Sequence, residues 1–190
     1  MITKTKCELL IIGGSAGSLN MALRIIRLLK PAMNVAVMIV FHRKKAEEAT
    51  LIDLLSTRTE MNVKEAEDKD DIIPGTIYVA PADYHLLIEK DRTISLDFSE
   101  KVNYSRPSID VAIESASEVF GASLGCILLS GANADGVAGL VMARRAGALI
   151  IVQDPASAEF PIMPQHAVSR VPVDLLLHEN NLAALVDLLS

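Results

Sequence analysis

Runs of apolar residues alternate with helical periodicity along the chain. The apolar run over residues 9–12 predicts a buried strand over 8–12, and after a glycine-rich stretch apolar residues recur at helical spacing over 19–29. A second apolar strand is predicted over 35–41, followed by a helical pattern over 46–57. This order of strand, helix, strand, helix is typical of a parallel sheet in which helices form the crossover connections.

The middle of the chain has a different pattern. An acidic stretch over 65–71 predicts a solvated connection, and Pro74-Gly75 then introduces short strands over 76–80, 85–89 and 93–97. A Lys90-Asp91 turn separates the last two of these strands. The pattern therefore predicts a β-hairpin inserted into an otherwise alternating fold.

The second half of the chain returns to strand and helix alternation. The predicted elements are a helix over 107–120, a strand over 126–129, a helix over 135–146, a strand over 149–153, a short helix over 164–169, a strand over 173–177 and a helix over 182–189. We therefore predict an α/β fold of three layers: a doubly wound, Rossmann-like, mostly parallel sheet with helices on both faces and the inserted hairpin.

The composition narrows the class of protein. The length of 190 residues, with 51% hydrophobic and 22% charged residues, predicts a single domain over 1–190. The apolar runs are too short to cross a membrane, and the charged start shows no signal or transit peptide, so we expect a cytoplasmic protein without membrane insertion. A net charge of −6 argues against nucleic-acid binding. The two cysteines suggest neither a disulfide nor a zinc framework.

Three residues that directly follow predicted strands have side chains suited to catalysis. Ser15 follows the first strand, His42 follows the second, and Asp135 follows the strand over 126–129 across a short loop. Because ligands of open α/β sheets bind outside the carboxyl ends of the strands, we expect these side chains to meet there. Nucleophile, base and orienting carboxylate are the three parts of a serine hydrolase triad. Asp135 also stands where it would cap the helix that it opens.

The turn around Ser15 allows two interpretations. Residues 13–17 fit the G-x-S-x-G pattern of a nucleophile elbow, and the amides of Ala16 and Gly17 would face a developing oxyanion. Glycines after a first strand are also common in nucleotide-binding loops. The spacing fits neither G-x-G-x-x-G nor a P-loop, yet from these residues alone the two interpretations stay nearly even.

Other residues compete for the catalytic roles. The remaining histidines fit less well as the base: His85 in the hairpin region, His166 on a short helix and His178 near the end of the chain. Asp154 is the alternative carboxylate, although Asp-Pro is an ordinary start of a turn. Ser130 lacks an elbow around it. The basic cluster Arg43, Lys44 and Lys45 predicts a solvated helix entry that would also steer an acidic substrate.

Several separated motifs resemble one known family. The motifs, in chain order, are Ile12-Gly13-Gly14-Ser15-Ala16-Gly17, Val40-Phe41-His42, Arg106-Pro107-Ser108-Ile109-Asp110, Ser130-Gly131-Ala132-Asn133-Ala134-Asp135-Gly136 and 153–160 running on to Met163-Pro164. Together they resemble the catalytic domain of the CheB-type chemotaxis protein-glutamate methylesterases. The resemblance spans about residues 9–177, and it favours the hydrolase interpretation of the turn over the nucleotide-binding one.

The resemblance implies a reaction and a partner. It implies that Ser15, His42 and Asp135 form the triad and that Ala16, Gly17 and Ala132 lie around the oxyanion site. The implied reaction is hydrolysis of glutamate γ-methyl esters on the cytoplasmic helices of methylated chemoreceptors, with glutamine deamidation as a related activity. It implies no metal and no organic cofactor.

The chain departs from the family pattern near the nucleophile. The family usually has threonine and a glycine pair after the nucleophile, where this chain has Ala16 and then Gly17-Ser18, and methionine where Ala132 stands. It also usually has Met-Pro after the histidine, where this chain has Arg43-Lys44. These departures motivate an alternative, a weakly active or inactive receptor-binding scaffold. Because the catalytic strand begins by residue 8, we expect no receiver domain, and hence regulation by a separate protein.

Overall fold

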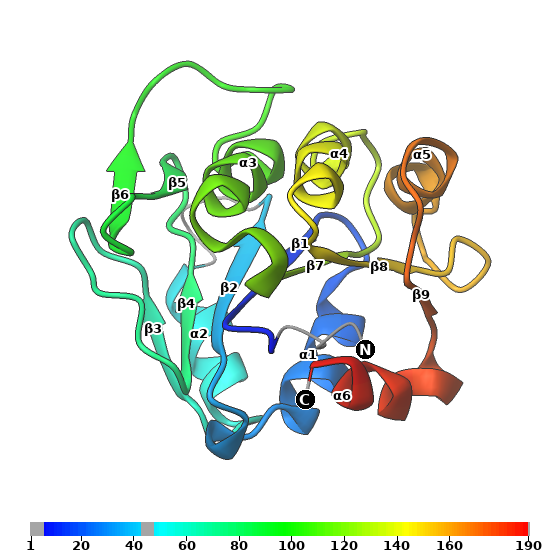
Figure 1. The fold of residues 1–190 in the computed structure, drawn as a ribbon, viewed down its shortest axis with the longest axis horizontal. Coiled ribbons are helices and arrows are strands. Elements are labelled where there is room, and N and C mark those ends of the chain that lie inside the picture. The colour runs from blue at the N-terminus through cyan, green and yellow to red at the C-terminus, as the bar shows by residue number, and fades with distance from the viewer. Residues whose placement is uncertain (1–5, 43–47, 190) are drawn as a thin grey trace.

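The computed structural model describes residues 6–42 and 48–189, and its centre is a seven-stranded sheet (Figure 1). In chain order its strands are β1 (Leu9–Gly14), β2 (Ala36–Phe41), β3 (Asn62–Glu65), β4 (Thr76–Val79), β7 (Leu124–Leu128), β8 (Leu149–Gln153) and β9 (Leu175–Leu177). The spatial order is β3-β4-β2-β1-β7-β8-β9, and all neighbours are parallel. Strands β2 to β4 lie on one side of β1 and strands β7 to β9 on the other. The sheet is therefore doubly wound, with its switch point between β1 and β7. The predicted fold class is confirmed.

Helices cover both faces of this sheet. They are α1 (Leu19–Leu28), α2 (Glu48–Ser56), α3 (Ile109–Phe120), α4 (Val137–Arg145), α5 (Ile162–Arg170) and α6 (Leu182–Leu189), with short 3-10 helices at Pro31–Met33, Gly121–Ser123 and Glu179–Asn181. Figure 1 shows α3, α4 and α5 on one face and α1, α2 and α6 on the other. Alternate residues of β1 belong to two separate apolar cores, Leu9 and Ile11 to one and Leu10 and Ile12 to the other. A strand buried on both faces is apolar throughout, as its sequence predicted.

The inserted hairpin is present as predicted. Strands β5 (His85–Ile88) and β6 (Ile94–Asp97) pair antiparallel and form a separate two-stranded sheet. Leu86 and Ile94 are buried in the same apolar core as α3, and Figure 1 shows the hairpin beside that helix. The hairpin therefore extends the layer of helices on that face, and the long loop after β6 leads back into α3.

The structure differs from the sequence predictions at several ends of elements. The edge strand β3 was missed because its sequence, NVKE, contains a single apolar residue and its side chains are partly or fully exposed. The helix predicted from Asp135 begins at Val137, and α5 begins at Ile162, which places Pro164 in its first turn. The beginning of the helix predicted over 46–57 and the cluster Arg43, Lys44 and Lys45 lie outside the described residues.

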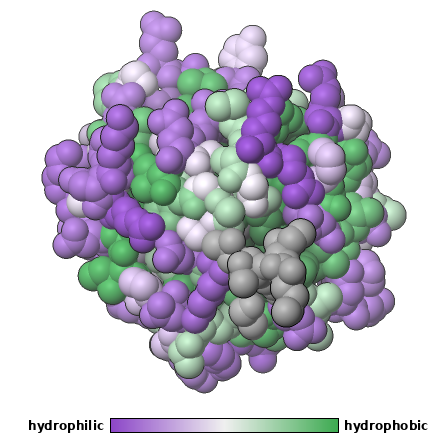
Figure 2. All heavy atoms as spheres, in the orientation of Figure 1, coloured by the Kyte–Doolittle hydropathy of each residue, from purple (hydrophilic) through white to green (hydrophobic). Residues whose placement is uncertain are grey.

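The face of the molecule drawn in Figure 2 is largely hydrophilic. Figure 2 shows charged and polar side chains around most of one face, with smaller hydrophobic patches between them. Over residues 6–42 and 48–189, no helix combines the length and the apolar character that crossing a membrane requires.

Candidate active site

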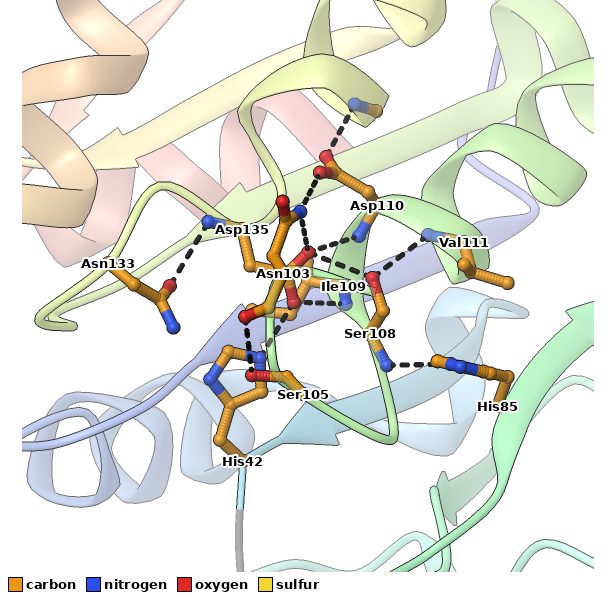
Figure 3. Close-up of polar contacts among 11 residues, drawn as sticks. His42, His85, Asn103, Ser105, Ser108, Ile109, Asp110, Val111, Asn133 and Asp135 are labelled. Carbon is orange, nitrogen blue, oxygen red and sulfur yellow. Dashed lines mark hydrogen bonds and ion pairs between the residues drawn. The ribbon is translucent and has the colours of Figure 1, made fainter. Parts of the chain in front are cut away.

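The carboxyl ends of β1, β2 and β7 bring the three predicted catalytic residues to one edge of the sheet. Gly14 and Phe41 are paired in the β1–β2 register, and the His42 amide donates to the Gly14 carbonyl at 3.3 Å. Ser15 and His42 therefore leave neighbouring strands at the same level. Asp135 follows β7, the other neighbour of β1, and its carboxylate Oδ2 lies 2.7 Å from His42 Nε2 (Figure 3). The site thus stands at the switch point of the sheet.

The Asp135 carboxylate is buried at the amino end of helix α3. Oδ2 accepts hydrogen bonds from the Ile109 amide at 2.7 Å and from His42 Nε2, and Oδ1 accepts from the Asp110 amide at 3.1 Å and the Ser108 hydroxyl at 2.8 Å. Free backbone N–H groups at a helix start are a natural anion site. The Asp135 side chain is 0% exposed, against 12% for His42. The fold therefore holds this carboxylate in one place.

These contacts fix the protonation pattern of the His42–Asp135 pair. Burial by itself raises the pKa of Asp135, but the hydrogen bonds from His42 and from the Ile109 and Asp110 amides lower it to about 2. At neutral pH Asp135 is therefore ionised and only accepts hydrogen bonds, so the His42 nitrogen facing it, Nε2, must carry a proton. In neutral His42 the other nitrogen, Nδ1, is then the basic one.

The turn that carries Ser15 needs glycines because other atoms approach it closely. A Cβ on Gly13 would lie 2.6 Å from Ile109 Cγ2, and one on Gly14 would lie 2.6 Å from Ser18 Cβ. Gly17 has φ +75°, a left-handed conformation that side chains other than glycine rarely adopt. The turn is therefore a packed corner that leaves Ser15 half-buried and the Ala16 side chain exposed.

Two other serines hold this corner in shape. The Ser18 hydroxyl donates to the Ser15 carbonyl at 2.6 Å. The buried Ser130 hydroxyl donates to the Ala16 carbonyl at 2.7 Å and accepts from the Phe160 amide at 2.9 Å. The Ser15 amide itself donates to the Ser130 carbonyl at 2.9 Å. Ser130, a rival nucleophile in the sequence, thus supports the corner.

Several polar groups of the corner are left free within residues 6–42 and 48–189. The Ser15 hydroxyl makes no hydrogen bond to another described residue, and the amides of Ala16, Gly17 and Ala132 have no acceptor there. The Ala132 side chain is exposed in the loop after β7. Backbone N–H groups without an acceptor are the kind of donor that an oxyanion site requires.

Three polar residues behind Asp135 were not assigned a role from the sequence: Asn103, Ser108 and Asp110. Asn103 Nδ2 donates to Asp110 Oδ2 at 2.9 Å and to Asp135 Oδ1 at 3.3 Å, while Asp110 Oδ1 accepts from the Gly139 amide at 2.7 Å (Figure 3). Ser108 could have been found, because a serine just before a helical pattern is a typical N-cap, and its hydroxyl accepts from the Val111 amide. Asn103 lies in a loop without any such signal.

Burial and the nearby negative charge of Asp135 act on the second carboxyl of this network in the same direction. Burial raises the pKa of Asp110, the hydrogen bond from the Gly139 amide lowers it, and the charges of Asp135 and Glu114 raise it, so that the pKa stands at about 6. Two carboxyls within one hydrogen-bonded network are thus pushed to opposite sides of the usual value. Asp135 keeps its charge, and Asp110 takes up a proton more readily than an ordinary aspartate.

The rival residues of the sequence lie elsewhere. His85 is buried behind the site, where its Nδ1 accepts from the Ser108 amide at 3.1 Å, and His166 is exposed on α5. His178 caps the 3-10 helix Glu179–Asn181. The Asp154 carboxylate accepts from the Ala156 amide in its own turn, as the Asp-Pro sequence suggested.

The expectation that Asp135 caps the helix following it is wrong. Gly136, with φ +92°, is the N-cap of α4. The Asp135 carboxylate instead accepts hydrogen bonds from the first amides of α3, a helix that comes earlier in the chain. In the described part of the chain, no three His, Cys, Asp or Glu side chains are grouped so that they could hold a metal ion.

A serine on a strand–turn–helix corner, beside a histidine paired with a buried aspartate on a parallel α/β sheet, is the arrangement of a serine hydrolase. The family model described as "CheB methylesterase" matches residues 10–186. The chain belongs to the CheB methylesterase family.

Individual relatives agree with this membership. A putative protein-glutamate methylesterase/protein-glutamine glutaminase of Leptospira interrogans is 42% identical over 94% of this chain and 92% of its own length. Protein-glutamate methylesterase/protein-glutamine glutaminase 2 of Syntrophus aciditrophicus is 29% identical over 96% of this chain but only 54% of its own length. The crystal structure of the CheB methylesterase catalytic domain of Thermotoga maritima superimposes with a TM-score of 0.89 at 26% identity, covering 97% of this chain and 98% of that one.

Proposed function

We propose that this chain is a protein-glutamate methylesterase, and also a glutaminase, that uses Ser15 as its nucleophile, His42 as its base and Asp135 as the orienting carboxylate. The observation that carries the proposal is the 2.7 Å contact between His42 Nε2 and Asp135 beside the strand end that presents Ser15. The names of the relatives support the reaction, since they are called protein-glutamate methylesterases and protein-glutamine glutaminases.

The first half of the reaction follows from the protonation pattern. With Nε2–H bound to Asp135, Nδ1 of His42 takes the Ser15 proton as the hydroxyl oxygen attacks the γ-carbonyl of an esterified glutamate. The resulting imidazolium is stabilised by the ionised Asp135. Nδ1 then returns the proton to the methoxy oxygen, so that methanol leaves and an acyl-Ser15 ester is left. With glutamine as substrate the same steps release ammonia.

The second half regenerates the enzyme. His42 takes a proton from water, and the hydroxide attacks the acyl-Ser15 carbonyl. Collapse of this second tetrahedral intermediate returns the proton to Ser15 and leaves a glutamate carboxylate on the substrate. In both halves the free amides of Ala16, Gly17 and Ala132 are the donors available to the oxyanion. Backbone donors do not depend on the side chain, so Ala16 and Ala132 can serve where the family has larger residues.

The proposed substrate is a methylated glutamate on a cytoplasmic helix of a chemoreceptor. The support is family membership, together with the position of the site in open loops at the edge of the sheet. Ser15 is half-buried and the His42 side chain is 12% exposed there, so a side chain standing out from a helix can reach them.

Methanol release from methylated receptor tests the proposal. We expect the wild-type chain to release methanol and Ser15→Ala to lower the rate by at least about 10³-fold, since the nucleophile is lost. Ser56→Ala on α2 is the matched control and should keep full activity, because among the described residues the Ser56 hydroxyl is hydrogen-bonded only to the Ile52 carbonyl. Equal methanol release by Ser15→Ala and wild type would refute the assigned nucleophile.

A serine-directed fluorophosphonate probe distinguishes an enzyme from a scaffold. We expect stoichiometric labelling of Ser15 that is lost in His42→Ala, because the probe reacts with an activated hydroxyl. A chain that binds receptor but is not labelled would instead support the receptor-binding scaffold that Ala16, Ser18 and Ala132 suggested.

A further inference from the structure

The loop between β6 and α3 exposes two aromatic side chains and contacts the candidate active site through Asn103. We call residues 98–106 the aromatic loop; it arcs above α3 in Figure 1. Phe98 is 64% exposed and Tyr104 is 97% exposed, and the ring of Tyr84 lies 5.5 Å from that of Phe98. Grouped aromatic side chains in water are unfavourable for a protein that works alone, and they commonly mark a binding surface.

This loop is tied down along its length. The Arg106 guanidinium lies 3.9 Å above the Phe98 ring and donates to the carbonyls of Phe98 and Ser99, the latter at 2.6 Å. His85 Nδ1 accepts a backbone N–H, so its Nε2 carries the proton and donates to the Glu100 carbonyl at 2.9 Å. A surface ordered before binding loses little conformational entropy when a partner arrives.

The middle of the aromatic loop reaches the catalytic machinery. Asn103 and Tyr104 both have left-handed backbone, with φ 49° and 62°. Left-handed conformation is costly for a bulky residue such as tyrosine, and it persists where the surroundings enforce it. Here Asn103 is fixed by its hydrogen bonds to Asp110 and Asp135, drawn in Figure 3. The residue after it, Tyr104, is left fully in solvent, one residue from a contact of the Asp135 carboxylate.

We propose that the aromatic loop is the docking surface for the helix of the substrate protein that carries the esterified glutamate, with Tyr104 as its main contact. This inference rests on the proposed function. The loop is continuous with the site through Asn103, so a helix lying on it would present side chains towards Ser15. Its rings suit the apolar stripe of an amphipathic helix. Lys101 is exposed in the loop, and its ammonium group suits acidic residues beside that stripe.

Kinetics on two substrates test the docking role. We expect Tyr104→Ser to raise KM for methylated receptor about 10-fold, the effect of a moderate contact residue, with kcat unchanged. Hydrolysis of p-nitrophenyl acetate, which is too small to touch the loop, should not change. Tyr104→Phe keeps the ring and should restore KM. Ile73→Ser, at a side chain 56% exposed just before β4, is the matched control for loss of an exposed apolar residue and should behave as wild type.

Binding to an inactive variant separates docking from catalysis. On the Ser15→Ala background, we expect Tyr104→Ser to weaken binding of a fluorescently labelled helical receptor fragment about 10-fold, as seen by anisotropy. If this loss occurs although the wild-type chain releases no methanol from receptor, the methylesterase proposal fails and the docking surface stands.

Three outcomes would overturn the docking surface. Unchanged KM and unchanged binding in Tyr104→Ser would show that the loop does not contact the substrate. Equal losses on receptor and on p-nitrophenyl acetate would make Tyr104 a structural residue. A dimer in analytical ultracentrifugation that Tyr104→Ser dissociates would assign the surface to a second copy of this chain.

Discussion

The two halves of the candidate active site are held by different means. In the Asp135 half, many hydrogen bonds hold one carboxylate. It accepts from the first amides of α3 and from the side chains of Ser108, Asn103 and His42. The Ser15 half relies on close backbone packing at a glycine corner, and its hydroxyl and nearby amides are free within the described residues. The proposed orienting group is thus saturated with partners, whereas the proposed reacting groups are left available to a substrate. Electrostatic preorganisation requires this division.

Replacing the Asp135 carboxylate should have the largest effect on catalysis of all the changes considered. Asp135→Asn puts an amide where only acceptors fit, and its N–H would bind the wrong tautomer of His42. We expect kcat to fall about 10⁴-fold, as in other serine hydrolases, with methanol release as the measurement and circular dichroism as the check of folding. Asp154→Asn, which alters the rival carboxylate in its own turn, should retain activity. A loss in Asp154→Asn equal to that in Asp135→Asn would contradict the assignment.

Adding a single methyl group at Gly17 should disturb the turn that carries Ser15. A Cβ on Gly17 would lie 2.7 Å from Glu159 Cβ and 2.8 Å from the Ser130 hydroxyl, at a φ of +75°. We expect Gly17→Ala to lower kcat about 10- to 100-fold, because a displacement of about 1 Å at the nucleophile costs that much. It should also lower the free energy of unfolding by more than about 1 kcal/mol in urea titration.

Gly75 provides the matched control for that change. It has nearly the same backbone, φ +80°, but a Cβ there would meet its nearest atom only at 3.8 Å. Gly75→Ala should therefore lose about 1 kcal/mol of stability from the backbone alone and keep full activity. Comparable losses of kcat in the two variants would argue against a special role for the Ser15 corner.

The smallest predicted effect is on the pH dependence of stability, through the carboxyls of Asp110 and Asp135. The pKa of Asp110 is raised to about 6, so its contribution to stability is present at low pH and is lost as pH rises from about 4 to 6, where the unfolded chain ionises first. The lowered pKa of Asp135 acts in reverse, and its contribution is lost as pH falls from about 4 towards 2.

Urea unfolding at several pH values should separate the two contributions. Asp110→Asn should flatten the decline in the free energy of unfolding between pH 4 and 6 relative to wild type, and leave the loss below pH 4. Parallel curves for wild type and Asp110→Asn over pH 4 to 6 would show that Asp110 does not take up its proton in the folded state.

Much of the fold could be predicted from periodicity, because a strand buried on both faces requires a continuous apolar run and a helix on the sheet requires apolar residues at helical spacing. Continuous apolar runs gave β1 and β2, and helical spacing gave α1 and α3. The edge strand β3 escaped, since a strand with mainly polar, partly exposed residues has no such pattern. The beginning of α4 was misplaced because Gly136, rather than Asp135, caps it.

The sequence by itself determined that a serine, a histidine and an aspartate each follow a strand, because the apolar pattern of each strand is local. Only the tertiary structure decided how these groups are supported. Asn103, Ser108 and Asp110 come from a loop and a helix start about 30 residues before Asp135, and no local pattern connects them to it. Their contacts arise because the amino end of α3 packs against the loop that follows β7. This packing results from burial of α3 and β7 in one apolar core, and not from residues that are neighbours in the sequence.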